Sequence, residues 1–176
     1  MADVNRLWRD VLRLNSRSQD AEVEALVVQC LDFEGPWTTR LIGALGILRE
    51  RLGPWAGVSL YMPTKPQGDL YVAASAGTVG PLVVAWGAPV AGLAASERTA
   101  QFCAEARSFP DYQGGWLGIQ GVLAVPIVRG SDFYGVLEAR GHEGHTFGMA
   151  EAEVTGHMAS LMAERWPTST RHKMGG

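Results

Sequence analysis

The stretch from Gly121 to Arg140 (GVLAVPIVRGSDFYGVLEAR) constrains the fold of this chain more than any other. It contains two apolar runs separated by the short polar segment 130–132, and this arrangement predicts a β-hairpin. The first run is apolar at almost every position, which is typical of a central strand that is covered on both faces. Pro126 interrupts this run. Because proline has no backbone N–H, we expect a bulge or an unpaired donor position there.

Length, composition and charge restrict the class of protein. A chain of 176 residues with 47% hydrophobic residues fits one domain plus an extension. The net charge is −3 and both signs are interspersed, so we expect no nucleic-acid partner. No apolar run approaches the roughly 18 residues of a membrane helix, and the charged N-terminus does not resemble a signal peptide. Cys30 and Cys103 do not form a disulfide framework, and we therefore expect a cytoplasmic protein without membrane contact.

The first third of the chain has the periodicity of amphipathic helices. A helix is expected over residues 2–14, and residues 15–18 (NSRS) are expected to end it. A second helix is expected to begin at a cap on Asp20. A third helix is expected from Trp37 to Leu52, after the Gly35-Pro36 step. The expected buried faces are Val4, Leu7, Trp8, Val11 and Leu12 in the first helix, Val23, Leu26, Val27, Cys30 and Leu31 in the second, and Trp37, Leu41, Ile42, Leu45, Leu48 and Leu52 in the third.

From residue 55 onward the apolar period changes to two, which indicates strands. Residues 56–62 and 69–75 predict a hairpin that precedes the central one. Residues 79–118 show no sustained period, and we expect an irregular segment there with at most short strands and helical turns. After the central hairpin, Gly148 is expected to cap a last helix that reaches about Trp166.

This order of elements predicts an α+β fold. Strands on short connections favour antiparallel pairing, and helices before and after one sheet favour a layered domain. We therefore divide the chain into an N-terminal helical extension of two helices (residues 1–35), a domain (residues 36–167) and a disordered tail (residues 168–176).

The central hairpin resembles the sequence hallmark of GAF domains. In that family an apolar strand ends in a Val-Pro-Ile/Leu step, and the next strand opens with Gly-Val-Leu. Val125-Pro126-Ile127 and Gly135-Val136-Leu137 match these two steps, and Phe147 with Glu151 fits the downstream pattern. The resemblance covers about residues 37–166. It implies a GAF/PAS-like antiparallel sheet of five to six strands, with the terminal helices packed on one face and a small-molecule pocket on the other.

The resemblance also implies a role in signal transduction. Most GAF domains are sensory or regulatory modules, and many dimerise through their terminal helices. The first predicted helix lies outside the minimal domain, and it must pack on the domain, on a second copy or on a neighbour. We expect a homodimer with parallel helices. No kinase, cyclase or DNA-binding segment follows the last helix, so we expect the signal to pass through a dimer contact or to a partner protein. No motif indicates a cofactor.

Aromatic residues gather in the irregular segment and favour an apolar or aromatic small ligand. Long irregular segments inside compact domains are often functional. Glu138 needs a partner if it faces inward, and Arg140 or Arg107 can supply one; the alternative is a carboxylate at the surface. Each aromatic residue has the alternative of closing one end of the core. The candidate ligand-binding residues are Trp86, Phe102, Cys103, Phe109, Tyr112, Trp116 and Glu138.

Catalysis is the main alternative function. Some GAF proteins are free methionine-(R)-sulfoxide reductases, which need loop cysteines and acidic residues on the central hairpin. Val122 and Arg140 stand where two of those acids are expected, only Glu138 is kept, and Cys103 has no resolving thiol in the loop. The predicted function is therefore a sensory module without catalytic activity. The alternatives are such a reductase and a ligand-free protein-interaction or dimerisation domain.

Motifs for a metal or a nucleotide are weak. His142 and His145 have a spacing that can bind a metal, but no third or fourth ligand is evident. The chain has no Gly-rich phosphate-binding motif and no readable catalytic triad. We therefore predict neither a metal site nor a nucleotide site.

Overall fold

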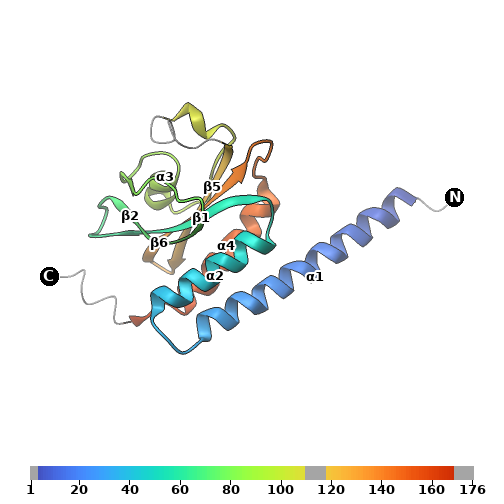
Figure 1. Cartoon of the computed structure of the whole chain (residues 1–176), viewed down its shortest axis with the longest axis horizontal. Helices are drawn as coiled ribbons and strands as arrows, with labels where there is room; N and C mark the ends of the chain where they lie inside the picture. Colours follow the sequence, from blue (N-terminus) through green and yellow to red (C-terminus); the bar gives the residue numbers. More distant parts are fainter. Residues whose placement is uncertain (1–3, 110–117, 169–176) are drawn as a thin grey trace.

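A six-stranded antiparallel sheet with the strand order β3-β2-β1-β6-β5-β4 forms the centre of the molecule (Figure 1). This computed structural model describes residues 4–109 and 118–168, and for residues 4–16 it describes only the helical backbone. The helices of this part are α1 (Val4–Asp32), α2 (Trp37–Arg51), α3 (Ala91–Glu97) and α4 (Met149–Glu164), with a 3-10 turn at Ala106–Ser108. The strands are β1 (Trp55–Pro63), β2 (Leu70–Gly77), β3 (Val83–Val84), β4 (Gln101–Cys103), β5 (Ile119–Arg129) and β6 (Asp132–His142).

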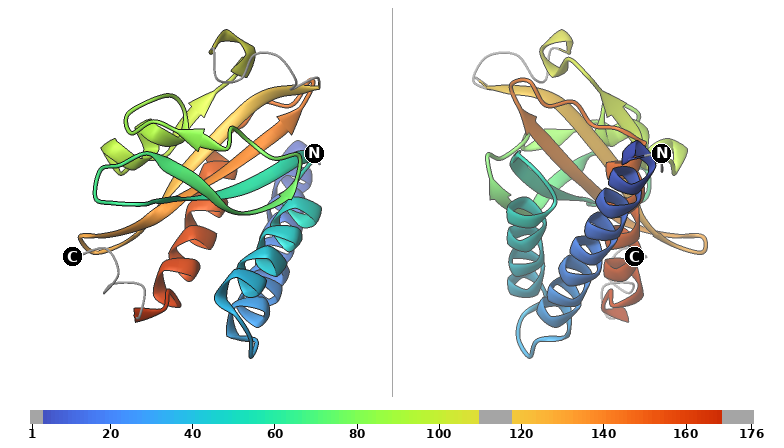
Figure 2. Two further views of the ribbon diagram at one scale, coloured as in Figure 1. Left: turned by 60° about the vertical axis from the view of Figure 1, so that its left-hand side comes forward. Right: turned by 90° about the vertical axis from the view of Figure 1, so that its right-hand side faces the viewer.

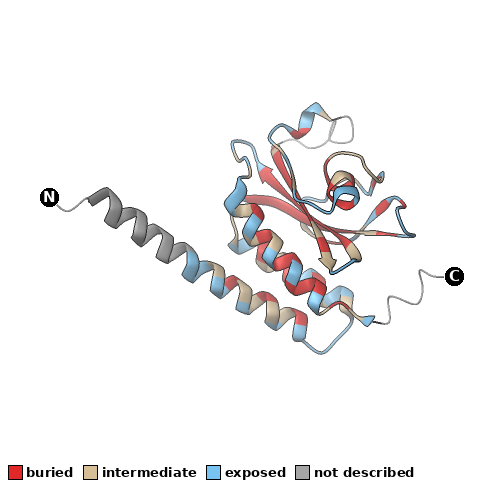
Figure 3. Ribbon diagram, turned by 180° about the vertical axis from the view of Figure 1, so that it is seen from behind, coloured by how far each residue is buried: buried red, intermediate tan, exposed pale blue. Residues whose placement is uncertain are grey.

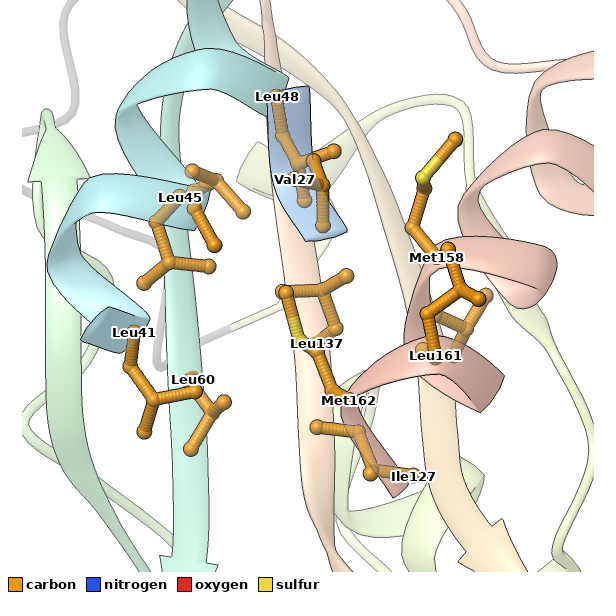
Figure 4. Packing of buried hydrophobic residues seen from close by; sticks show 14 of the residues in the cluster. Val27, Leu41, Leu45, Leu48, Leu60, Ile127, Leu137, Met158, Leu161 and Met162 are labelled. Atoms are coloured by element: carbon orange, nitrogen blue, oxygen red, sulfur yellow. The ribbon is translucent and has the colours of Figure 1, made fainter. Parts of the chain in front are cut away.

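The two faces of the sheet are covered differently (Figure 2). Helices α1, α2 and α4 pack on one face, which we call the helix face. α3 and the neighbouring residues of the described segment 79–109 cover the other, which we call the second face. Large aliphatic side chains fill the space between the helices and the sheet (Figure 4). Members of this helix-face cluster are Val27, Leu41, Leu45, Leu48, Leu60, Ile127, Leu137, Met158, Leu161 and Met162.

The central hairpin forms as predicted, from β5, a two-residue turn at residues 130–131, and β6. β5 lies between β6 and β4. Pro126 lies opposite Val136 on β6, whereas β4 pairs with β5 only as far as Ala124. The β5–β6 register also shifts between Ile127 and Val128. The proline therefore stands next to an irregularity and beyond the last β4 partner, where its missing N–H is tolerated.

The predicted break in the first helix is wrong. α1 is one helix of 29 residues, and Asp20 lies within it instead of capping a second helix. Residues 15–18 contain no glycine or proline, so their helix propensity costs little. The buried residues Val23, Val27 and Leu31 fix the second half of α1 on the helix face. The first half continues the same axis and extends past the rest of the chain (Figure 1).

The buried face of α2 contains Ala44 in addition to the predicted leucines, Trp37 and Leu52 are only partly buried, and the predicted Ile42 does not belong to it. Leu41, Ala44, Leu45 and Leu48 are buried, whereas Ile42 is 48% exposed. Figure 3 shows the general pattern, in which the strands are largely buried and the helices carry both buried and exposed residues. Successive helical residues are separated by about 100°, so Ile42 points away from the stripe that meets the sheet. The predicted tail lies outside the described residues, apart from Thr168.

The last helix begins as predicted at Gly148, whose N–H donates to the Glu151 carboxylate at 3.2 Å. None of the helices within residues 4–109 and 118–168 combines the length and the hydropathy that a membrane span requires.

Candidate functional site

The second face carries polar side chains at its centre. Successive strand residues point to opposite faces, so Leu137 and Ala139 join the helix-face cluster while Glu138 and Arg140 point to the second face. Ser59 on β1 lies directly opposite Glu138 in the β1–β6 register. Ser59, Glu138 and Arg140 are all fully buried. The chain therefore buries a charged pair on the second face, whereas the helices on the other face bury apolar side chains and, in α4, the uncharged Thr155.

Arg140 joins the sheet to the segment that follows β2. Its Nη1 donates to Glu138 Oε1 at 2.8 Å, and its Nη2 donates to Ser59 Oγ at 2.8 Å. Its Nε and Nη2 also donate to the carbonyl oxygen of Thr78, at 3.1 and 2.7 Å. Hydrogen bonds from a charged donor are strong in a low-dielectric interior. Arg140 therefore holds the backbone at Thr78 against the sheet.

Tyr61 and Gly80 complete this arrangement, which we call the Arg140 cluster (Ser59, Tyr61, Gly80, Glu138 and Arg140). The Tyr61 hydroxyl donates to the Pro81 carbonyl at 2.9 Å and lies 3.5 Å from Glu138 Oε1. Gly80 lies directly over the cluster, because a Cβ there would overlap the Tyr61 hydroxyl and lie 2.7 Å from Arg140 Nη1. Residues 78–81 thus form a closely fitted cover.

The electrostatics of the Arg140 cluster favour a positioning role. Burial raises the pKa of the Tyr61 hydroxyl well above its usual range, and the neighbouring Glu138 carboxylate raises that pKa further, while Arg140 opposes the rise. Tyr61 therefore stays protonated and remains a hydrogen-bond donor. Arg140 donates hydrogen bonds to Glu138, Ser59 and Thr78 at once. This arrangement binds the cover and does not present Glu138 as an isolated acid or base.

Helix α3 covers the neighbouring part of the second face with small side chains. Ala91, Ala94 and Ala95 are fully buried, and a Cβ at Gly92 would overlap the carbonyl oxygen of Ala85. α3 therefore lies close to the sheet. The buried members of this second-face cluster are Tyr61, Leu70, Val84, Val90, Ala91, Ala94, Ala95, Ala106, Val122, Ala124 and Val136.

An aromatic group lies at one border of the second-face cluster. The rings of Trp86 and Phe133 meet edge to face, with centroids 5.6 Å apart. The guanidinium of Arg98 lies 3.9 Å from the Phe133 centroid and 5.7 Å from the Trp86 centroid. Rings and a planar cation in this arrangement attract one another and also suit a planar or anionic small molecule.

Cys103 lies near the opposite border. It pairs with Val122 across β4 and β5, and with Phe109 it packs partly buried against the second-face cluster. Burial raises the pKa of the Cys103 thiol, a backbone hydrogen bond at Glu105 lowers it, and burial is the larger effect. The thiol therefore predominates over the thiolate at neutral pH. The other cysteine, Cys30, packs against the helix-face cluster on the far side of the sheet.

The structure brings together four of the seven predicted site residues. Trp86, Cys103 and Phe109 pack on the second-face cluster, and Glu138 belongs to the Arg140 cluster beside it. Phe102 is the exception, because it lies opposite Leu123 of the helix-face cluster and is 41% exposed. Phe102 therefore occupies the other face of the sheet from the predicted site. The two remaining predicted residues, Tyr112 and Trp116, lie outside the described residues.

The partner of Glu138 is one of the two expected, Arg140, whereas Arg107 is exposed in the 3-10 turn. Sequence reasoning missed Ser59 and Tyr61. Their alternation with Val58 and Leu60 places both on one face of a strand, but only the β1–β6 register reveals that this face meets Glu138.

The His-x-x-His segment takes part in helix capping. His145 Nε2 lies 2.9 Å from Glu151 Oε1, and the other oxygen of Glu151 accepts the N–H of Gly148. Among the residues that the structure describes, no three His, Cys, Asp or Glu side chains are grouped as metal ligands would be.

Comparisons with known proteins identify the fold. No protein-family model and no curated protein match the chain. Among solved structures, a GAF domain of a phosphoenolpyruvate-protein phosphotransferase from Coxiella burnetii is 22% identical over 84% of this chain and 92% of that domain, with a TM-score of 0.71. The GAF domain of the Acinetobacter phosphotransferase is 14% identical over 89% of this chain and 96% of that domain, with a TM-score of 0.72.

An enzyme is equally similar in structure. Free methionine-R-sulfoxide reductase from Neisseria meningitidis, solved in complex with its substrate, is 21% identical over 86% of this chain and 92% of that chain, with a TM-score of 0.71. At these identities the likeness concerns the fold alone. The chain therefore has a GAF-like α+β fold, as its central hairpin predicted, and its function must be argued from its own residues.

Proposed function

We propose that this chain is a cytoplasmic GAF-type regulatory module without catalytic activity, which binds a small molecule or a signalling partner at its second face. The observation that carries the proposal is the separation of the two cysteines. Cys103 borders the second face, whereas Cys30 lies on the helix face, and the sequence contains no other thiol. A disulfide requires Cα atoms within about 7 Å, and the sheet stands between Cys30 and Cys103. Cys30 therefore cannot serve as the resolving thiol that a reductase cycle at Cys103 would need.

The state of Glu138 adds support. A free carboxylate on this face would suit the ammonium group of an amino-acid substrate. Glu138 instead receives Arg140 Nη1 at 2.8 Å in a fully buried pair, beneath a cover that Gly80 fits closely. Opening this pair to a substrate would leave a buried charge without its partner, which is costly.

A turnover assay tests the absence of catalysis. Purified protein is incubated with free methionine-(R)-sulfoxide, thioredoxin, thioredoxin reductase and NADPH, and methionine is measured by chromatography. We expect no methionine above the rate without protein, and the same result for Cys103→Ser. Methionine formation that Cys103→Ser abolishes would refute the proposal and establish the reductase alternative, which several structurally similar enzymes make worth testing.

A ligand-free interaction domain is the second alternative. The alanine-lined contact of α3 with the sheet favours it, because α3 leaves little space above Ala124 and Val136, which are fully buried. The ligand proposal relies instead on the aromatic border at Trp86 and Phe133. Native mass spectrometry separates the two, because a retained small molecule supports ligand binding and an empty protein supports an interaction domain.

A further inference from the structure

Arg98 places a positive charge at the aromatic border of the second face. It follows directly after α3 (Figure 1), and its guanidinium lies 3.9 Å from the Phe133 centroid and 5.7 Å from the Trp86 centroid. The two aromatic residues are partly buried, whereas Arg98 is exposed. The rings therefore hold the guanidinium in one place while molecules from solvent still reach it.

The N–H groups of Arg98 differ from those of the other two stacked arginines in the described part of the chain. Arg40 donates to two backbone carbonyl oxygens, at 3.0 and 3.1 Å. Arg129 donates to a tyrosine hydroxyl at 2.6 Å and to a backbone carbonyl oxygen at 3.2 Å. Among the residues that the structure describes, none forms a hydrogen bond or ion pair with Arg98, and the adjacent Glu97 accepts a hydrogen bond from Gln101 instead. Arg98 is thus positioned by rings, and its donors are available to a ligand.

The backbone at Arg98 is unusual for a residue with a large side chain. Its φ of 58° and ψ of 30° lie in the left-handed region. Helices often end on a residue in this conformation, and glycine is the usual choice because a Cβ is unfavourable there. Termination of α3 therefore does not by itself require an arginine. Residues held in such a conformation are concentrated at functional sites.

The surroundings of Arg98 suit a negatively charged ligand with an apolar part. Residues 70–96, which include β2, β3, Trp86 and most of α3, contain no charged side chain. No acid from this stretch therefore competes for the guanidinium. Partial burial lowers the pKa of Arg98 from its usual value, but an arginine keeps its charge at neutral pH. A guanidinium binds a carboxylate or phosphate through two parallel hydrogen bonds, and the ring of Trp86 provides an apolar surface beside it.

We propose that Arg98 binds the carboxylate of a small organic acid whose apolar or aromatic part packs on Trp86. A carboxylate suits the site better than a phosphate, because Arg98 supplies a single positive charge and phosphate sites commonly use several arginines or a helix N-terminus. This inference rests on the proposed function, since it names the class of ligand at the second face. It places that ligand at the border opposite Cys103.

Titration with benzoate, followed by proton–nitrogen correlation NMR, tests the assignment. The readouts are the indole N–H of Trp86 and the Nε–H of Arg98, whose signals are identified by their absence in Trp86→Phe and Arg98→Gln. Benzoate should shift both signals to saturation in the wild type, whereas benzyl alcohol, which has the ring but no charge, should not. Arg98→Gln should raise the benzoate dissociation constant about tenfold, as expected for the loss of a charged hydrogen-bond donor.

Two further variants separate charge from geometry and from general effects. Arg98→Lys keeps the charge but loses the planar pair of donors, so it should weaken benzoate binding by a smaller factor than Arg98→Gln does. Arg129→Gln removes a stacked guanidinium whose ring partner, Tyr134, packs on the helix face, and it should leave the dissociation constant unchanged. Circular dichroism verifies that each variant is folded.

Several results would overturn the proposal. These are equal benzoate affinity in the wild type and Arg98→Gln, equal shifts with benzyl alcohol, and the absence of a saturable shift in the wild type. Phenyl phosphate is titrated in parallel, and tighter binding of phenyl phosphate than of benzoate would overturn the assignment of a carboxylate.

Native mass spectrometry distinguishes failure of this inference from failure of the proposed function. A small molecule that the wild type retains should be lost from Arg98→Gln. If Arg98→Gln retains it equally, ligand binding stands and the role of Arg98 is wrong. If the wild type retains no molecule although benzoate binds through Arg98, the carboxylate site stands and the contradiction concerns the proposed function.

Discussion

The two faces of the sheet are packed by different means. On the helix face, α1, α2 and α4 bury leucine, isoleucine, valine and methionine against the strands. On the second face, alanines of α3 and the buried Glu138–Arg140 pair occupy the corresponding positions. Leu137 and Glu138 are neighbours on β6 and are both fully buried, yet they belong to these two environments.

This difference indicates that the second face, which contains the buried charge, depends more strongly on particular residues than the helix face does. Apolar packing tolerates exchange of residues of similar volume, whereas a buried charge requires each of its partners. In general, a buried ion pair is often no more stabilising than apolar residues of similar volume. The effect of the Arg140 cluster is to fix residues 78–81 in one position through the contacts of Arg140 and Tyr61.

Among the variants considered, Glu138→Ala is expected to have the largest effect, and it tests the difference in packing between the two faces of the sheet. It leaves Arg140 buried without the acceptor at 2.8 Å, and we expect the free energy of unfolding to fall by about 3–5 kcal/mol. Leu137→Ala on the other face should lower it by about 2–5 kcal/mol through lost packing alone. Urea unfolding measures both. Glu138→Gln, which keeps the shape and an acceptor oxygen, should cost less than Glu138→Ala. A loss below about 1 kcal/mol for Glu138→Ala would remove the distinction between the faces.

Gly80→Ala tests how closely the cover fits. The added methyl group would overlap the Tyr61 hydroxyl and approach Arg140 Nη1 to 2.7 Å. We expect a loss of about 1–3 kcal/mol in unfolding free energy, as for other overpacked sites. The matched control is Gly46→Ala in α2, where no atom lies within 4 Å of the new Cβ. That substitution should stabilise the protein by about 0.5–1 kcal/mol through better helix propensity. Equal effects at the two glycines would argue against a fitted cover.

Tyr61→Phe should have the smallest effect at neutral pH. Losing the hydrogen bond to Pro81 costs about 0.5–1.5 kcal/mol. The pKa of Tyr61 is raised in the folded state, whereas an unfolded tyrosine has a pKa near 10. Below pH 10 both states keep the proton, and above it only the unfolded state ionises, so stability falls as pH rises further, by about 1.4 kcal/mol per pH unit. Unfolding curves from pH 8 to 11 should show a shallower loss for Tyr61→Phe than for the wild type. Identical slopes would contradict the buried, protonated state.

The sequence predicts correctly those features of the fold that are determined by residues close together in the chain. The central hairpin, the position of Pro126 and the start of α4 at Gly148 all depend on neighbouring residues, and the structure confirms each. The orientation of Phe102 was not predictable in this way, because β4 has three residues and so short a strand shows no reliable period.

The candidate site depends on contacts between distant residues. Ser59 and Arg140 are 81 positions apart in the sequence and meet only through the β1–β6 register. The continuity of α1 was also hidden, because Asn15 and Ser16 are common at helix ends and only the packing of the second half shows that the helix continues.

Native mass spectrometry of protein purified from cells tests the central claim most directly, since that claim assigns ligand binding to the second face. We predict that the wild type retains a small molecule that Trp86→Ala loses. Trp37→Ala, which alters an edge-to-face contact with Trp166 on the helix face, should keep it. A wild-type protein that carries no small molecule, or a ligand lost equally in both variants, would contradict the assignment of ligand binding to the second face.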